Sequence, residues 1–133
     1  MDKVMLMCVL HDLGEAFTGD IPTFYKTECD EKLEEKLLYE WVDSLPEPYC
    51  TEMRGLYDEM AQRETLEAKI YKAIDGLEAV LQHNESALST WIPREYALNQ
   101  VYANDKVAFS AYLTDLRRAL REDTVKKLET EMK

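Results

Sequence analysis

LEAKIYKAIDGLEAVLQHNE, residues 66–85, gives the clearest indication of the fold class. Its apolar residues recur every three or four positions, as they do along one face of an α-helix: Leu66, Ile70, Ala73, Ile74, Leu77 and Leu81. Thr65 stands directly before the stretch and can cap a helix, while Asn84 and Ser86 predict its end. These residues therefore predict a long amphipathic helix.

The segments on either side also have helical patterns. Further helices are expected over residues 4–13, 30–45, 48–63, 93–102 and 110–132. The first is apolar enough to predict burial on several sides. The last has an apolar face of Leu113, Leu116, Leu120, Val125 and Leu128. No segment shows the alternation of a strand, so the sequence predicts an all-α fold, a single domain over residues 1–133 with about six helices.

The residues between the first two helices contain Gly19, Asp20 and Pro22, which predict a loop or a broken helix. The formal net charge of −11 argues against duplex DNA or RNA as a partner, because phosphate binding relies on Lys and Arg. A nucleotide substrate remains compatible, since one bound metal ion supplies strong local positive charge. No stretch is long and apolar enough to span a bilayer. Cys8, Cys29 and Cys50 are expected to be reduced thiols, which predicts a cytoplasmic protein.

HDLGEAFTGDIPTFYK, residues 11–26, holds the densest group of chemically active side chains. His11 and Asp12 end the most apolar helix, where ionisable groups cost free energy unless they are paired or bound. Glu15 lies four residues after His11, on the same face if the helix continues. A histidine nitrogen and carboxylate oxygens suit a divalent ion. An isolated His-Asp pair is more often a hydrogen-bonded histidine at a helix end, so the metal site is a hypothesis that depends on this context.

Asp75 is a second candidate, inside residues 66–85. At about 100° per residue it lies roughly 180° from Leu66, on a face that also carries small residues such as Ala68. If another helix packs there, Asp75 needs a cation or hydrogen-bond donors; otherwise it is a solvated carboxylate. Gly76 costs up to about 1 kcal/mol relative to Ala in a helix, which indicates a close approach or a relaxed site. His83 is expected to be a surface residue near the helix end.

Together these stretches resemble the HD-domain metal-dependent phosphohydrolases, especially the 5'-deoxynucleotidase-like branch. Residues 11–26 resemble the core motif of that family, and AKIYKAIDGLEAVLQ, residues 68–82, resembles its later helix with the last metal-binding Asp. The combination of HDxxE, TGDIP and a later DxLEA is fairly specific, whereas the His-Asp pair alone is not. The similarity covers roughly residues 1–85.

The resemblance implies a function and a role for each matching residue. His11, Asp12 and Asp75 would bind a divalent metal ion such as Mn²⁺, Co²⁺ or Mg²⁺. Glu15 would orient or activate water, Asp20 would lie near the substrate and the leaving oxygen, and Lys26 would meet the phosphate. The implied reaction is hydrolysis of a (deoxy)nucleoside 5'-monophosphate, and the implied assembly is a homodimer.

The chain departs from the family pattern at one ligand. The first metal-binding histidine of the family comes from a helix upstream of the His-Asp pair, and the sequence begins about ten residues before His11. His83 follows Asp75 and is in the wrong order. The expectation is therefore an HD domain without the family's N-terminal helices, with weaker metal binding. Exposure of the apolar residues 4–10 would promote self-association.

Two other readings stay open. One is a catalytically impaired HD-fold remnant that acts as an oligomeric or nucleotide-binding module, which the missing histidine favours. The other is a helical interaction protein that uses acidic amphipathic helices. Nucleophile elbows and glycine-rich phosphate loops are absent from the sequence.

Overall fold

The computed structural model describes residues 1–22 and 25–132, and every regular element in this part of the chain is helical. The helices are α1 (Asp2–Leu10), α2 (Glu15–Thr18), α3 (Glu28–Asp43), α4 (Tyr49–Gln62), α5 (Leu66–Glu85), the 3-10 helix η1 (Leu88–Thr90), α6 (Pro93–Leu98), α7 (Asn104–Val107) and α8 (Ala111–Glu131). The all-α prediction is confirmed, and the longer α-helices match the six expected from the sequence. Thr23 and Phe24, inside the 11–26 motif, lie outside the described residues.

Side-chain caps explain where several helices begin. The Thr65 hydroxyl accepts a hydrogen bond from the Ala68 amide at 3.2 Å, so the predicted start of α5 is confirmed. Thr27 and Asp30 cap α3 reciprocally: each side chain accepts from the backbone amide of the other residue. This capping box makes α3 begin two residues earlier than the apolar pattern indicated.

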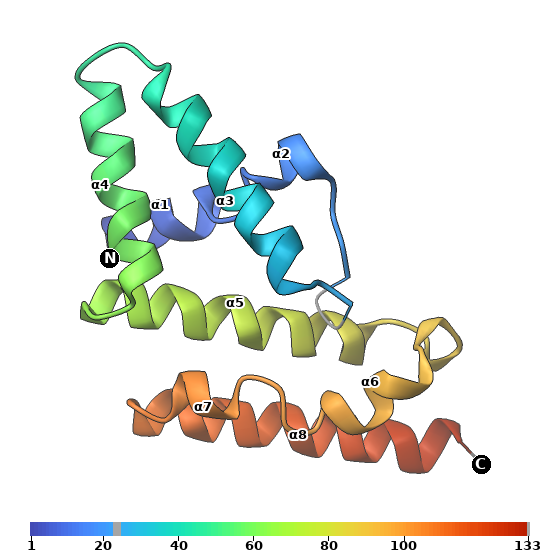
Figure 1. The fold of residues 1–133 in the computed structure, drawn as a ribbon. Coiled ribbons are helices and arrows are strands. Elements are labelled where there is room, and N and C mark those ends of the chain that lie inside the picture. Colours follow the sequence, from blue (N-terminus) through green and yellow to red (C-terminus); the bar gives the residue numbers. More distant parts are fainter. Residues whose placement is uncertain (23–24, 133) are drawn as a thin grey trace. The chain divides into compact units, whose positions relative to one another are not determined.

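Contacts divide the chain into two compact units, Met1–Ala68 and Lys69–Lys133. A single domain over residues 1–133 therefore stays a prediction. In the first unit, α3 and α4 form an antiparallel hairpin, α2 packs on α3, and α1 packs on α4 (Figure 1). The main buried apolar residues are Val4, Met7, Leu38, Val42, Tyr57 and Met60.

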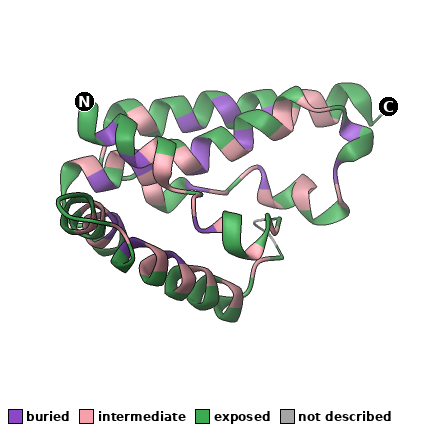
Figure 2. Ribbon diagram, turned by 90° about the horizontal axis from the view of Figure 1, so that it is seen from above, coloured by how far each residue is buried: buried purple, intermediate pink, exposed green. Residues whose placement is uncertain are grey.

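The prediction that the first helix is buried on several sides is wrong in this structure. Only Val4 and Met7 of α1 are buried. Met5 is 60% exposed and Val9 is 78% exposed. The reason is that α1 uses one face for its packing, so the apolar residues on its other faces stay in contact with solvent. Figure 2 shows the same striping on the longer helices, with buried residues on one side and exposed residues on the other.

In the second unit α8 runs alongside α5 (Figure 1). The core between the helices of this unit consists of Ala73, Leu77, Val80, Val107 and Leu120. Gly76 is explained by its neighbour, since a Cβ there would lie 2.6 Å from the Ala103 Cβ. Part of the predicted apolar face of α5 is exposed, including Ile74 at 40% and Leu81 at 43%. On the face that carries Asp75, Ala68 is fully buried.

A buried polar network also lies in the second unit. The Asn99 side chain, fully buried, donates to Asn84 Oδ1 at 3.1 Å and to Thr124 Oγ1 at 3.0 Å. His83 Nδ1 lies 2.9 Å from Asn99 Oδ1, so His83 is half-buried and hydrogen-bonded rather than a simple surface residue. Arg117 is 2% exposed and donates to the carbonyls of Tyr102 and Asn99 near the end of α6. These bonds join α5, α6 and α8.

Candidate functional site

The His11 side chain is held by the turn from which it projects. Its Nδ1 lies 2.5 Å from the Cys8 carbonyl oxygen, one turn earlier. A carbonyl only accepts hydrogen bonds, so Nδ1 carries the proton and donates. The other ring nitrogen, Nε2, lies 3.1 Å from Asp12 Oδ2. The structure therefore brings together the two adjacent residues that the sequence nominated as metal ligands.

This geometry suits either an ion pair or a divalent cation held by both atoms. With the proton on Nδ1, the Nε2 lone pair and the Asp12 carboxylate oxygen are both acceptors at 3.1 Å. Two acceptors this close require a second proton on the imidazole or a cation that both atoms bind. Histidines that bind metals usually donate from the other ring nitrogen to a carbonyl or carboxylate, as His11 does to Cys8.

Glu15 is the first residue of the short helix α2, and Asp20 follows the turn at Gly19 that ends it. The Glu15 side chain is 23% exposed. Burial, together with the negative charges of Asp12 and Asp20, raises the pKa of Glu15, against the opposing effect of Lys26. Gly19 adopts φ 84° and ψ 164°, a conformation that essentially only glycine takes. This glycine redirects the chain after α2, and Asp20 follows at an exposed position.

Lys26 is held by an acid that the sequence reasoning missed. Its Nζ lies 2.6 Å from Glu34 Oε2 of α3 and 4.0 Å from Glu15 Oε1. Burial lowers the pKa of Lys26, but the hydrogen bond and charge of Glu34, with Glu15 and Asp12, outweigh it and raise the pKa. Glu34 also packs on Gly14, where a Cβ would lie 2.8 Å from its Cγ. Glu34 had no signal in the sequence beyond being one of several acids on a charged helix.

Asp75 belongs to the second unit. Its Oδ2 accepts a hydrogen bond from Lys72 Nζ at 3.0 Å, and its side chain is 27% exposed. The half-buried acid therefore has a cation beside it, as a packed carboxylate requires. Within residues 1–22 and 25–132, the structure assembles no group of three or more His, Cys, Asp or Glu side chains that could hold a metal ion. The joint role of His11, Asp12 and Asp75 at one ion stays a prediction.

The sequence matches the HD-domain family over residues 1–117. The chain belongs to the HD-domain family. Among characterised relatives, the 5'-deoxynucleotidase HDDC2 of Bos taurus is 30% identical over 86 residues, which cover 63% of this chain and 42% of the relative. The protein of the same name from Dictyostelium discoideum is 33% identical over 85 residues, covering 62% of this chain and 45% of the relative.

A bacterial relative matches to a similar extent. The 5'-deoxynucleotidase of Erwinia tasmaniensis is 32% identical over 87 residues, which cover 61% of this HD-domain chain and 43% of the relative. The chain thus matches less than half the length of these relatives. No solved structure matches the chain significantly. No helix in the described residues is long and apolar enough to cross a membrane.

Proposed function

We propose that this HD-domain protein is a metal-dependent phosphohydrolase that removes phosphate from (deoxy)nucleoside 5'-monophosphates. The observation that carries the proposal is the paired arrangement of His11 Nε2 and the Asp12 carboxylate, with the His11 ring oriented by the Cys8 carbonyl. Family membership supports the reaction class, and the names of the relatives support the substrate class.

His11 and Asp12 would hold a divalent ion such as Mn²⁺, Co²⁺ or Mg²⁺, and the family pattern assigns Asp75 as a further ligand. Such an ion, when bound, polarises a phosphate and lowers the pKa of water. Glu15 is suited to accept a proton from water, because its raised pKa makes it a better base than an ordinary carboxylate. Asp20 would act beside the leaving oxygen, and Lys26 would attract the phosphate from its position between Glu15 and Glu34.

The alternative is an HD-fold module that binds a nucleotide or assembles into oligomers without catalysis. It is favoured by the family pattern, which uses one more histidine ligand than His11, Asp12 and Asp75 supply. The homodimer implied by the family resemblance belongs to both proposals. Exposed apolar residues on α1 support self-association in either case.

The test is phosphate release from a panel of deoxynucleoside 5'-monophosphates with added Mn²⁺, Co²⁺ or Mg²⁺. His11→Ala, Asp12→Asn and Asp75→Asn should each abolish metal-dependent release. His83→Ala, which removes the other histidine of the chain, is the control and should retain it once circular dichroism shows that the variant is folded. Release that survives chelation and His11→Ala would contradict the proposal. Absence of release, combined with a metal-induced rise in Tm that needs His11, would favour the non-catalytic module.

A further inference from the structure

The backbone that carries His11 is held by a tyrosine from another helix. Tyr57 of α4 donates its hydroxyl proton to the Leu10 carbonyl oxygen at 2.9 Å. Leu10 is the last residue of α1, and the carbonyls at a helix end have no partner within the helix. The same carbonyl also accepts from the Leu13 amide at 3.2 Å. Both lone pairs of the Leu10 oxygen are therefore used at the turn that leads into Asp12.

This bond acts directly on the position of His11. The Leu10 carbonyl and the Cα of His11 belong to one planar peptide group. A donor that fixes the oxygen therefore fixes the plane to which the His11 Cα is attached. The Cys8 carbonyl fixes the imidazole ring of the same residue. One interaction sets the backbone and the other sets the ring, and together they determine where Nε2 lies beside the Asp12 carboxylate.

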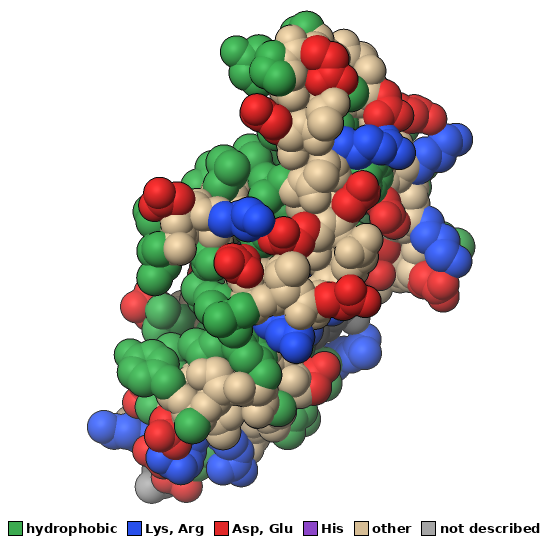
Figure 3. Space-filling view, turned by 90° about the vertical axis from the view of Figure 1, so that its left-hand side faces the viewer, with side chains coloured by type: hydrophobic (Ala, Val, Ile, Leu, Met, Phe, Trp, Pro, Cys, Tyr) green, Lys and Arg blue, Asp and Glu red, His purple; other side chains and the backbone are tan. Residues whose placement is uncertain are grey.

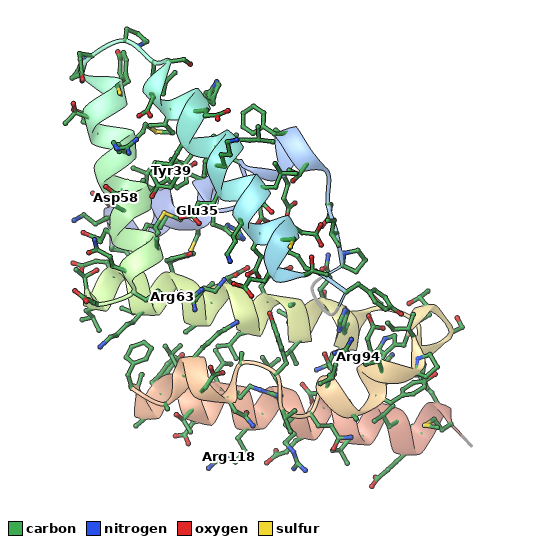
Figure 4. All side chains as sticks on the ribbon, in the orientation of Figure 1. Glu35, Tyr39, Asp58, Arg63, Arg94 and Arg118 are labelled. Carbon is green, nitrogen blue, oxygen red and sulfur yellow. The ribbon has the colours of Figure 1, made fainter. Side chains whose placement is uncertain are left out.

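Tyr57 is itself well fixed. Its side chain is among the buried residues of the first unit, at 5% exposure, and burial raises its pKa to about 12. The hydroxyl consequently remains protonated, and able to donate, throughout the pH range of ordinary assays. The ring of Tyr39 lies edge-on to it, with centroids 6.5 Å apart. Tyr39 comes from α3 and points its hydroxyl to Asp58 at 2.7 Å (Figure 4), so it makes a similar bond that does not involve α1.

We propose that Tyr57 is a positioning residue for the metal-binding pair His11 and Asp12, acting through its hydrogen bond to the Leu10 carbonyl. The inference rests on the proposed function, because it assigns Tyr57 a role in that same site. Tyr57 is no catalytic residue: its hydroxyl is committed to the backbone of α1. Loss of the hydroxyl should leave the ligands in place but release the orientation of the turn, which weakens metal binding.

The experiment compares Tyr57→Phe with Tyr39→Phe in the full chain. Each substitution removes one hydroxyl, from the buried ring of Tyr57 or from the neighbouring half-buried ring of Tyr39, so Tyr39→Phe controls for the loss of a tyrosine hydrogen bond in this unit. Mn²⁺ binding is measured by electron paramagnetic resonance without substrate, and His11→Ala defines binding at this site. Tyr57→Phe should weaken Mn²⁺ binding by about tenfold, in the range of changes to residues that orient metal ligands. Tyr39→Phe should stay within about twofold of the wild type, since it does not touch the turn.

A second measurement needs no metal. The Leu13 amide bonds to the carbonyl that Tyr57 holds, so its hydrogen exchange in the metal-free protein should be faster in Tyr57→Phe than in Tyr39→Phe. Equal Mn²⁺ affinity in both variants would overturn the inference, as would equal exchange rates at Leu13. If the wild-type protein binds no Mn²⁺ that depends on His11, the proposed function and the metal part of this inference are overturned. The exchange rate of the Leu13 amide would still decide whether Tyr57 holds the turn.

Unnatural side chains keep the test decisive if Tyr57→Phe does not fold. At position 57, 4-aminophenylalanine keeps a donor at the ring tip, whereas 4-methylphenylalanine fills the same space without one. The amino variant should retain Mn²⁺ binding close to the wild type, and the methyl variant should lose it. Equal behaviour of the two would show that the space is what matters and would reject the hydrogen-bond role.

Discussion

Lys26 and Glu34 form a close ion pair, with Nζ 2.6 Å from Oε2, while the Glu15 carboxylate lies 4.0 Å from the same ammonium. The positive charge of Lys26 is thus engaged mainly by an acid outside the sequence motif. A substrate phosphate that uses Lys26 has to compete with Glu34. Under the proposed function, Glu34 would therefore limit how strongly Lys26 attracts the phosphate.

Replacing either member of this pair should change KM in opposite directions. If Lys26 binds the phosphate as proposed, Lys26→Met should raise KM for the nucleotide by about tenfold, because that interaction would be lost. Glu34→Gln should lower KM, because the ammonium no longer has a competing carboxylate. Steady-state kinetics on the same nucleotide give both values, with Lys36→Met, an exposed lysine on α3, as the control. A rise in KM for both variants would instead indicate that the pair only supports the fold.

Gly14 should resist substitution by alanine although its backbone conformation is an ordinary helical one. The added Cβ would lie 2.8 Å from Glu34 Cγ, so the side chain that holds Lys26 must move. We expect Gly14→Ala to lower the free energy of unfolding by about 1–3 kcal/mol.

The matched control is Gly55→Ala in the middle of α4, where nothing lies within 4 Å of the new atom. That variant should be more stable than the wild type by up to about 1 kcal/mol. Urea unfolding of the two variants supplies the comparison. Stabilisation by Gly14→Ala would show that Glu34 moves aside at no cost.

Glu15→Gln should stabilise the metal-free protein at neutral pH. The pKa of Glu15 is raised in the folded state by burial and by Asp12 and Asp20, so folding favours the protonated form. The wild-type protein therefore loses stability as the pH rises from the unfolded-state pKa through the higher folded-state value. Glutamine mimics the neutral carboxyl and avoids this loss. Melting curves in a chelator should show a difference in Tm at pH 7 that disappears below pH ~4; a difference independent of pH would contradict the assignment.

The sequence predicts the helices well because their apolar spacing and caps are local. The α5 boundaries agree with the prediction at both ends, and Thr65 caps it as expected. The apolar composition of α1 predicts burial on several sides, whereas the family comparison predicts exposure of residues 4–10. The composition alone does not decide, since a wholly apolar helix does not reveal how many neighbours it has. The buried face of α8 includes Arg117 and Thr124, which a count of apolar residues passes over because their burial depends on partners elsewhere in the chain.

The sequence nominates candidate ligands, whose role stays a prediction, but it does not identify the residues that support them. His11, Asp12 and Glu15 lie within five residues of one another, so their joint presence follows from the motif. Glu34 and Tyr57 reach the motif from α3 and α4 through tertiary packing. Acidic residues are common on charged helices, and tyrosines are common on amphipathic ones. The sequence therefore does not single out Glu34 or Tyr57, and only the fold shows that they contact the motif.

The polar network of the second unit should depend on the Thr124 hydroxyl. Thr124 Oγ1 accepts from the fully buried Asn99 side chain at 3.0 Å and lies 2.7 Å from Asn84 Oδ1, to which it can donate. Thr124→Val keeps the shape but removes both contacts, and we expect a loss of about 1–3 kcal/mol. Thr130→Val, at an exposed position of the same helix, should change stability by less than about 0.5 kcal/mol. Similar urea midpoints for the two variants would mean that water replaces the hydroxyl.

The apolar surface of α1 should drive self-association. Val9 is 78% exposed, and Leu6 lines a groove of about 320 Å³ with Met53 and Leu56 of α4. Figure 3 shows a face of the molecule where apolar side chains lie among acidic and basic ones. The net charge of −11 opposes association through repulsion, so association should strengthen as salt screens the charge. Light scattering at increasing salt measures the mass.

Val9→Glu should reduce this association by placing a charge on the apolar surface. Tyr112→Glu is the matched control, because Tyr112 is an apolar residue with the same 78% exposure on α8. If α1 forms the contact, only Val9→Glu should shift the protein towards the monomer. Both variants add one negative charge, so a difference between them cannot come from general charge repulsion. A monomeric wild type at high salt would refute the prediction, and an equal shift in both variants would place the contact elsewhere.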